Sequence, residues 1–252
     1  MSVTLKKRAL AITFVVSACF STAVAQLNVP KHEIGASAGL FIYQGDLTPE
    51  AAGAFKSPGI NFNLFYNRLL SRSFSLRTNL ALGKLMADDA NYKDPDWRRQ
   101  RGFLFTARTA ELSELLVWNI LGNNYNDKQV ISPYIFGGVG LSSLRITRDW
   151  HRYNPDYFAD DSTFLKGLGA DTLHALPGTI PVIPVGVGLR YAISSNLSIM
   201  AEASYRFTFT DYLDGFSQSG NPNKNDYYSS YTIGLIYTLG RSNSLKCPVM
   251  RY

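Results

Sequence analysis

The sequence LSIMAEASYRFTF, at Leu197–Phe209, is the clearest indication of the fold. Its odd-numbered positions all carry apolar or aromatic side chains, whereas most of its even-numbered positions carry polar or charged ones. This period-2 alternation predicts a β-strand with one apolar face. At about 13 residues, the strand is longer than the five or six residues usual in soluble sheets, and it matches a tilted strand that crosses a bilayer.

Seven further segments alternate apolar with small or polar residues in the same way. They lie at Ile34–Ile42, Ile60–Tyr66, Phe74–Gly83, Phe103–Trp118, Pro133–Arg145, Ile183–Tyr191 and Ser230–Leu239. A closed barrel in lipid suits such strands, because hydrocarbon covers the apolar faces and the lumen pairs the polar groups. Closure also removes the exposed strand edges. The sequence therefore predicts an all-β chain that folds as an eight-stranded antiparallel transmembrane β-barrel of the outer-membrane type.

The connections predict the orientation of this barrel in the outer membrane. With an even number of strands both termini lie on one side, which we expect to be the periplasm, and the longer connections then point outward. The outward connections are expected at about Gly45–Ser57, Ala87–Gly102, Thr147–Pro181 and Asp211–Asp226. The inward connections are expected at Asn67–Ser73, Asn119–Ser132 and Ala192–Asn196.

Aromatic side chains near the predicted strand ends match the interfacial girdles of membrane barrels. They are Tyr43, Tyr66, Phe74, Trp118, Tyr134, Tyr191, Phe209, Tyr212, Tyr231 and Tyr237. An ordinary hydrophobic core is the alternative interpretation, and the length of the strands argues against it.

Composition excludes two other classes of protein. The 252 residues are 46% hydrophobic, 13% aromatic and only 17% charged, whereas disorder needs high charge and few aromatic residues. After residue 25, the most apolar stretch is Leu173–Leu189, and it is broken by Pro177, Pro181 and Pro184. A membrane-spanning helix is therefore not expected.

The first 25 residues are typical of a secretory signal peptide. Lys6–Arg8 precede the apolar run Ala9–Ala18, and Ala23–Ala25 form an A-x-A cleavage site. A rival interpretation is a lipobox at Val16–Cys19, in which Cys19 would carry the lipid.

Cleavage after Ala25 removes three basic residues and no acidic one, which lowers the net charge from +6 to +3. Neither this charge nor the compartment favours a nucleic-acid partner. The barrel is then expected over residues 26–241, followed by a periplasmic tail at residues 242–252. A single cysteine, Cys247, remains in the mature chain, so a disulfide within the domain is excluded.

Several tracts resemble the Bacteroidota outer-membrane β-barrel family that includes PorG, the barrel subunit of the type IX secretion system. The most specific tracts are YQGDL at Tyr43–Leu47 and TDYLD at Thr210–Asp214. The others are Ser73–Arg77, Pro133–Gly138, Pro184–Tyr191 and Glu202–Phe209. The resemblance implies a non-enzymatic barrel in protein transport that anchors a periplasmic ring, built of a lipoprotein and a partner. The same family also contains barrels of unknown role, and family membership alone does not carry function.

Five charged residues fall on the polar faces of the predicted strands: Arg77, Glu111, Arg190, Glu202 and Arg206. Eight strands leave an interior that side chains just fill, so a water-filled channel is not expected. Because unpaired charges there would be costly, we expect arginine–carboxylate pairs that form a structural plug. A proton or ion path is the alternative interpretation.

Two other positions depart from the barrel pattern. Cys247 is an odd cysteine in an oxidising compartment, which predicts a disulfide to a periplasmic subunit or else a free thiol. Glu114 has the same parity as Leu112 and Leu116, so a regular strand would point it at lipid. A β-bulge between Ser113 and Leu115, a position near the interface or contact with a partner would each relieve this cost.

Charged groups in the outward connections suggest ligands. The cluster Trp97–Arg101 could hold lipopolysaccharide phosphates, because arginine matches phosphate geometry. Asp160-Asp161 and Asp211…Asp214 could bind calcium, but they lack the spacing of a recognised calcium loop. Solvated loops are the alternative in each case, and we predict no metal site and no cofactor.

An enzyme is the rival functional class, because some small outer-membrane barrels modify lipids at the outer rim. The histidines are His32, His151 and His174, and Asp149 and Ser162 could in principle join His151. No nucleophile motif accompanies them, so no catalytic residue is predicted. The expected function is a non-enzymatic anchor or scaffold with outer-membrane lipid, lipopolysaccharide and periplasmic ring subunits as partners. The alternative is a stand-alone structural or ligand-binding barrel.

Overall fold

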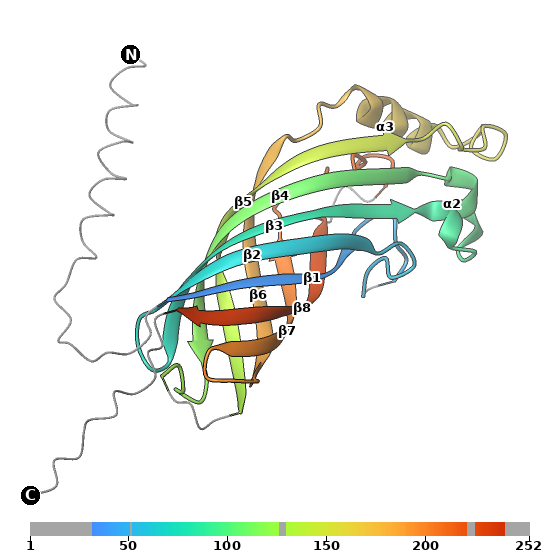
Figure 1. Ribbon diagram of the computed structural model, residues 1–252. Coiled ribbons are helices and arrows are strands. Elements are labelled where there is room, and N and C mark those ends of the chain that lie inside the picture. The colour runs from blue at the N-terminus through green and yellow to red at the C-terminus, as the bar shows by residue number, and fades with distance from the viewer. Residues whose placement is uncertain (1–31, 51, 126–129, 221–224, 240–252) are drawn as a thin grey trace, which may run out of the picture.

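The computed structural model describes residues 32–50, 52–125, 130–220 and 225–239. Within them the chain forms eight long strands (Figure 1). The strands are β1 (His32–Gln44), β2 (Gly59–Leu69), β3 (Phe74–Asp88), β4 (Leu104–Asn119), β5 (Ile131–Asp149), β6 (Thr179–Ala192), β7 (Leu197–Phe207) and β8 (Tyr227–Leu239). The predicted signal peptide at residues 1–25 and the tail with Cys247 lie outside the described residues.

Each strand pairs with its sequence neighbour in antiparallel fashion, and β1 pairs with β8 to close the sheet. The result is a closed eight-stranded barrel of the outer-membrane type, which confirms the predicted fold class. No helix in the described ranges is long and apolar enough to span a membrane.

Alternation along the strands separates an inner from an outer face. In β2, every second residue is buried, and the intervening side chains of Ile60, Phe62 and Leu64 are 62%, 59% and 60% exposed. Such a continuous apolar exterior is stable only where hydrocarbon covers it. The outer face of the barrel is therefore the lipid-facing one.

The two ends of the barrel differ. The loop end carries the four connections 45–58, 89–103, 150–178 and 208–226, with the short helix η1 (Asp89–Asn91), α2 (Asp96–Arg101) and α3 (Ser162–Leu173) (Figure 1). The turn end carries the connections 70–73, 120–130 and 193–196, together with the start of β1 and the end of β8. Thus the longer connections gather at one end, and the predicted outward loop at Thr147–Pro181 contains a helix.

Strand β7 is shorter than predicted. It ends at Phe207, and Phe209 adopts a positive φ of 56°. This backbone conformation, uncommon outside glycine, turns the chain out of the strand direction. Thr208 is fully buried, and its hydroxyl donates a hydrogen bond to the carbonyl of Asp226. The described residues 208–220 of this connection therefore turn into the barrel mouth, where Leu213, Asp214 and Phe216 are fully buried.

Strand β6 contains two prolines, Pro181 and Pro184, both within the apolar stretch Leu173–Leu189. The β5–β6 ladder is interrupted between Gly137 and Gly140, opposite Pro184. The reason is that proline lacks the N–H that a ladder needs.

Most predicted girdle residues are exposed and three are not; one of the three, Tyr212, lies partly buried in the connection 208–226 and donates to Asp171. Tyr43 is fully buried and Tyr134 is 5% exposed, so both occupy the interior. The prediction that both tyrosines lie on the outer face ignored the alternation of side chains along each strand. Tyr43 falls between the outward positions of β1, and Tyr134 is the inward neighbour of Ile135. Closeness to a strand end alone did not determine the face.

Candidate functional site

The ion pair nearest the turn end joins β6 to β1. Arg190 Nη1 lies 2.7 Å from Glu33 Oε1, and the carboxylate is 2% exposed. Asn67 donates to Glu33 Oε2 at 3.0 Å, and the Thr238 hydroxyl donates to Oε1 at 3.2 Å. The sequence prediction missed Glu33, although it has the same parity as the inward residues of β1.

The second ion pair joins β3 to β7. Arg77 Nη1 is ion-paired with Glu202 Oε1, and the Tyr134 hydroxyl donates to the same oxygen at 2.6 Å. Arg77 Nε donates to Asn67 Oδ1 at 2.9 Å, and its guanidinium lies 4.4 Å from the centre of the Phe65 ring. Asn67 thus connects the first two ion pairs.

The third ion pair joins β4 to β7. Arg206 Nε donates to Glu111 Oε2 at 3.1 Å, and the Tyr228 hydroxyl donates to the same oxygen at 2.7 Å. Glu111 is fully buried, and the Ser113 hydroxyl donates to its other oxygen at 3.3 Å. The structure thus distributes the five predicted interior charges over three ion pairs, with Glu33 as the sixth member.

These three ion pairs cross the barrel interior at successive levels. Each buried carboxylate accepts from an arginine and from at least one hydroxyl or amide, which offsets the cost of removing it from water. The arrangement is suited to bracing opposite walls of the barrel.

The loop end is filled differently, by an apolar core. Phe103 and Phe216 stack at 4.2 Å between ring centres, and Phe158 and Phe164 stack at 4.0 Å. The core also contains Phe41, Tyr43, Leu47, Leu85, Phe105, Leu144, Leu168, Ile180, Val182, Leu213 and Tyr228. Side chains of strands, of α3 and of the connection 208–226 thus form one core that closes this end.

Asp171 of α3 holds the connection 208–226 in place. Its carboxylate accepts from the backbone N–H of Gln218 at 3.0 Å and of Ser219 at 2.8 Å. It also accepts from the hydroxyls of Ser219 at 2.5 Å and Tyr212 at 3.3 Å. The fully buried Asp171 therefore clamps α3 to this loop.

Two carboxyls share one hydroxyl beneath this clamp. The Tyr43 hydroxyl lies 2.6 Å from Asp214 Oδ2 and 2.6 Å from Asp226 Oδ1. A phenol has one proton, so it donates to one carboxyl, and the other carboxyl must donate its own proton to the Tyr43 oxygen. Burial raises the pKa of both Asp214 and Asp226 well above the usual range, which favours this shared proton.

The basic cluster Trp97–Arg101 is mostly internal. Arg101 is 1% exposed, and its Nε donates to Asp89 Oδ2 at 2.7 Å. Arg98 donates to the carbonyl of Asp46 at 2.7 Å. Arg99 remains at the surface and faces Asp96. The hypothesis of a phosphate-binding cluster is therefore wrong for Arg98 and Arg101, because both are occupied in folding the loops.

The other loop candidates have structural contacts. Asp161 caps α3 by accepting from the N–H of Phe164 at 2.9 Å. His151 Nδ1 lies 3.0 Å from Asp149 and is largely exposed, and no described hydrogen bond joins it to Ser162. In the described part of the chain, no group of three His, Cys, Asp or Glu side chains is placed to hold a metal ion.

Glu114 points outward from an uninterrupted strand. It pairs in register with Thr78 on one side and Val139 on the other, so the predicted bulge is absent from this part of β4. The Thr78 hydroxyl donates to Glu114 Oε2 at 2.8 Å, and the side chain is exposed. A carboxyl group therefore lies on the lipid-facing surface.

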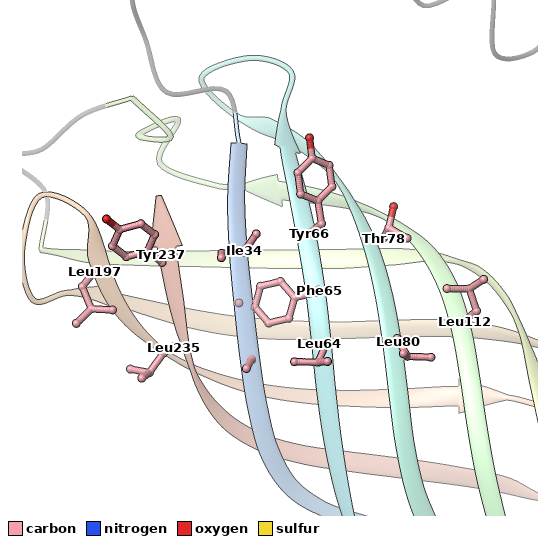
Figure 2. A pocket seen from close by; sticks show the side chains of 12 residues that line it. Ile34, Leu64, Phe65, Tyr66, Thr78, Leu80, Leu112, Leu197, Leu235 and Tyr237 are labelled. Carbon is pink, nitrogen blue, oxygen red and sulfur yellow. The ribbon is translucent and has the colours of Figure 1, made fainter. Parts of the chain in front are cut away.

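The turn end exposes apolar side chains beyond the aromatic residues of the outer face. They are Leu70, Ile120, Leu121, Val130, Ile131 and Ile193, each about half exposed. Nearby, the outer face has a hollow of about 620 Å³. Figure 2 shows the side chains that line it. Ile34, Leu64, Leu235 and Tyr237 line the hollow, and Gly35 has no side chain where the buried ring of Phe65 packs against the backbone. In the single chain, no described residue covers the apolar side chains of the turn end or the hollow on the outer face.

Several solved structures resemble this fold at low sequence identity. Neisserial surface protein A matches with a TM-score of 0.44 and 14% identity over 82% of this chain and 96% of its own. OprG from Pseudomonas aeruginosa matches with a TM-score of 0.44 and 12% identity over 84% and 98%. Ail of Yersinia pestis matches with a TM-score of 0.43 and 10% identity over 83% and 98%. No curated protein matches the sequence. Residues 7–248 match the family described as a domain of unknown function, DUF6089, and the chain belongs to that family.

Proposed function

We propose that this protein is a non-enzymatic outer-membrane barrel that anchors or scaffolds a periplasmic assembly, with both termini in the periplasm. The observation that carries the proposal is the exposed apolar set at the turn end, Leu70, Ile120, Leu121, Val130, Ile131 and Ile193. Exposed apolar side chains that gather at one rim are typical of an interaction site. The sequence resemblance to the PorG-containing family makes the type IX secretion ring, with its lipoprotein, the specific candidate partner.

The filled interior supports an anchor rather than a pore. Ion pairs cross the lumen between opposite strands, and an apolar core closes the loop end. A braced barrel of this kind can hold a docking surface at a fixed depth in the membrane. The mechanism requires the lipid-facing stripe, the interior network and the turn end, and it requires no reacting group.

The test is co-purification of tagged full-length protein from native outer membranes. We expect the ring lipoprotein and its partner to accompany the wild-type protein and to be lost with Leu121→Asp or Ile193→Asp. Leu173→Asp is the matched control, since Leu173 is 89% exposed at the loop end. Recovery of wild-type barrel without ring subunits would favour a stand-alone barrel. Ring binding that survives the turn-end substitutions would move the interface elsewhere.

Orientation and covalent linkage have separate tests. A membrane-impermeant amine reagent added to intact cells should label the exposed Lys166 of α3 if the loop end faces outward. The proposed disulfide from Cys247 should give a heavier band on non-reducing electrophoresis. A heavier band that persists in Cys247→Ser would contradict that linkage.

A further inference from the structure

Three cationic side chains lie side by side on the outer face. Lys84 of β3 is the register partner of Arg108 of β4, which in turn is the register partner of Arg145 of β5. All three are exposed. Adjacent strands lie about 4.8 Å apart, so the three side chains form a continuous row, here called the cationic row.

The cationic row begins where the apolar exterior ends. The next outward positions towards the turn end are Leu82, Ala110 and Ser143. At the other limit of this apolar band, Phe74 and Trp118 stack with their ring centres 6.3 Å apart. The rise from Phe74 to Lys84 is about 25 Å at the usual strand tilt, which equals the height of the apolar band of such barrels.

The inner face changes character at the same level. One residue from the cationic row towards the loop end, the inward residues in register are Leu85, Ala107 and Ile146, which belong to the apolar core of the loop end or pack against it. A barrel wall with an apolar inner face and a charged outer face is typical of a level surrounded by water and lipid headgroups. The cationic row therefore marks the boundary between hydrocarbon and headgroups.

Within the part of the chain that the structure describes, no carboxylate forms an ion pair with Lys84, Arg108 or Arg145 of the cationic row. The carboxylates of Asp88 and Asp149, two outward levels towards the loop end, have other partners, since Asp88 pairs with Arg152 and Asp149 with His151. The ligand must therefore supply negative charge at the headgroup level.

We propose that the cationic row binds the phosphate groups of a phosphorylated glycolipid of the lipid A type in the outer leaflet. Two arginine forks and one lysine match phosphate oxygens in charge and geometry. The outward Thr106 and Thr147, one level towards the loop end, offer hydroxyls beside the row. The choice of leaflet rests on the proposed function, in which the loop end faces outward.

Binding of lipid A to purified full-length protein in phosphatidylcholine nanodiscs tests this proposal without any ring subunit. We expect Arg108→Gln to weaken binding about tenfold, which corresponds to about 1.4 kcal/mol, and Lys84→Gln/Arg108→Gln/Arg145→Gln to weaken it further. Arg68→Gln/Arg72→Gln is the matched control, because both arginines are exposed at the turn end. Heat-modifiable migration on gels verifies that each variant is folded.

Dephosphorylated lipid A and phosphatidylglycerol complete the experiment. Dephosphorylated lipid A should bind the wild-type protein no better than lipid A binds the triple variant. Equal binding of phosphorylated and dephosphorylated lipid A would overturn the proposal, as would unchanged binding by the triple variant. The proposal would also be overturned if phosphatidylglycerol bound as tightly as lipid A. The cationic row would then bind any anionic lipid and would have no specificity for lipid A. If binding holds while ring co-purification fails, the scaffold function alone is wrong.

Discussion

The lipid-embedded part of the barrel and its loop end are built from the same strands with opposite polarity. In β4, the outward residues Leu112 and Leu116 face lipid, while the inward Glu111 lies in an ion pair. Closer to the loop end of this strand, Arg108 points outward, while Phe105 and Ala107 point into an apolar core. The inversion teaches that the surroundings of each level, and not the strand itself, decide which face is apolar.

The two fillings also differ in what holds them together. Ion pairs in the embedded part join strands that are far apart around the barrel, such as β4 and β7. At the loop end, rings from the connections complete the core, and Asp171 clamps them. Loss of an ion pair should therefore destabilise the embedded part most, whereas loss of a packed ring should destabilise the loop end most.

The largest effect is expected from Glu111→Ala, which leaves the buried guanidinium of Arg206 without a carboxylate. Removing one member of a buried ion pair costs about 3–5 kcal/mol. Glu202→Ala should act in the same direction through Arg77. Urea unfolding in micelles measures both effects, with Glu111→Gln as a milder control. An unchanged unfolding midpoint would show that the ion pairs do not brace the barrel.

Phe216→Ala should break the loop end alone. The loss of a buried ring that stacks on Phe103 costs about 3 kcal/mol. We expect faster proteolysis within the connection 208–226 and little change in the unfolding of the barrel. Phe209→Ala is the control, since Phe209 is 59% exposed in the same connection. Equal protection of both variants would mean that the apolar core does not close this end.

Acidification should strengthen the loop end. Burial raises the pKa of Asp214 and Asp226, so the folded state retains a proton at a pH where the unfolded chain has released it. The free energy of unfolding therefore falls as the pH rises above the ordinary carboxyl pKa. We expect it to increase again when the pH is lowered from 7.5 to 5.5.

Asp226→Asn imitates the protonated carboxyl. Its amide can donate to the Tyr43 oxygen, while its carbonyl accepts from the N–H of Leu213. The variant should raise the melting temperature at pH 7.5, by the equivalent of about 1 kcal/mol, and flatten the pH dependence. A lower melting temperature at both pH values would contradict the shared proton.

The smallest effect is expected at the surface of the embedded part. Glu114→Leu removes a carboxyl group from the lipid-facing surface and should stabilise the protein by about 1 kcal/mol in bilayers. Thr78→Val is the control, because it removes the hydrogen bond and keeps the carboxyl group. Retained stability together with lost ring co-purification would make Glu114 a partner contact.

Much of the fold could be predicted because strand parity is a local property. A side chain in a strand points to the face opposite its neighbour's, so LSIMAEASYRFTF reveals its two faces without any tertiary contact. The prediction failed where the backbone departs from the strand, as at Phe209, or where only closeness to a strand end was used, as for Tyr43. Parity could also have revealed Lys84, Arg108 and Arg145, which continue the outward positions of their strands.

The period of two along the sequence was enough to predict eight amphipathic strands in a barrel with their polar faces turned inward, because the parity of each residue is a local property. The tertiary structure alone decided which charges meet. Arg77 finds Glu202, Arg190 finds Glu33 and Arg206 finds Glu111 across the lumen, because closure brings together strands far apart in the sequence. It likewise decided that Arg98 and Arg101 fold inward and that the cationic row forms outside, since strand register is set between strands and not within one.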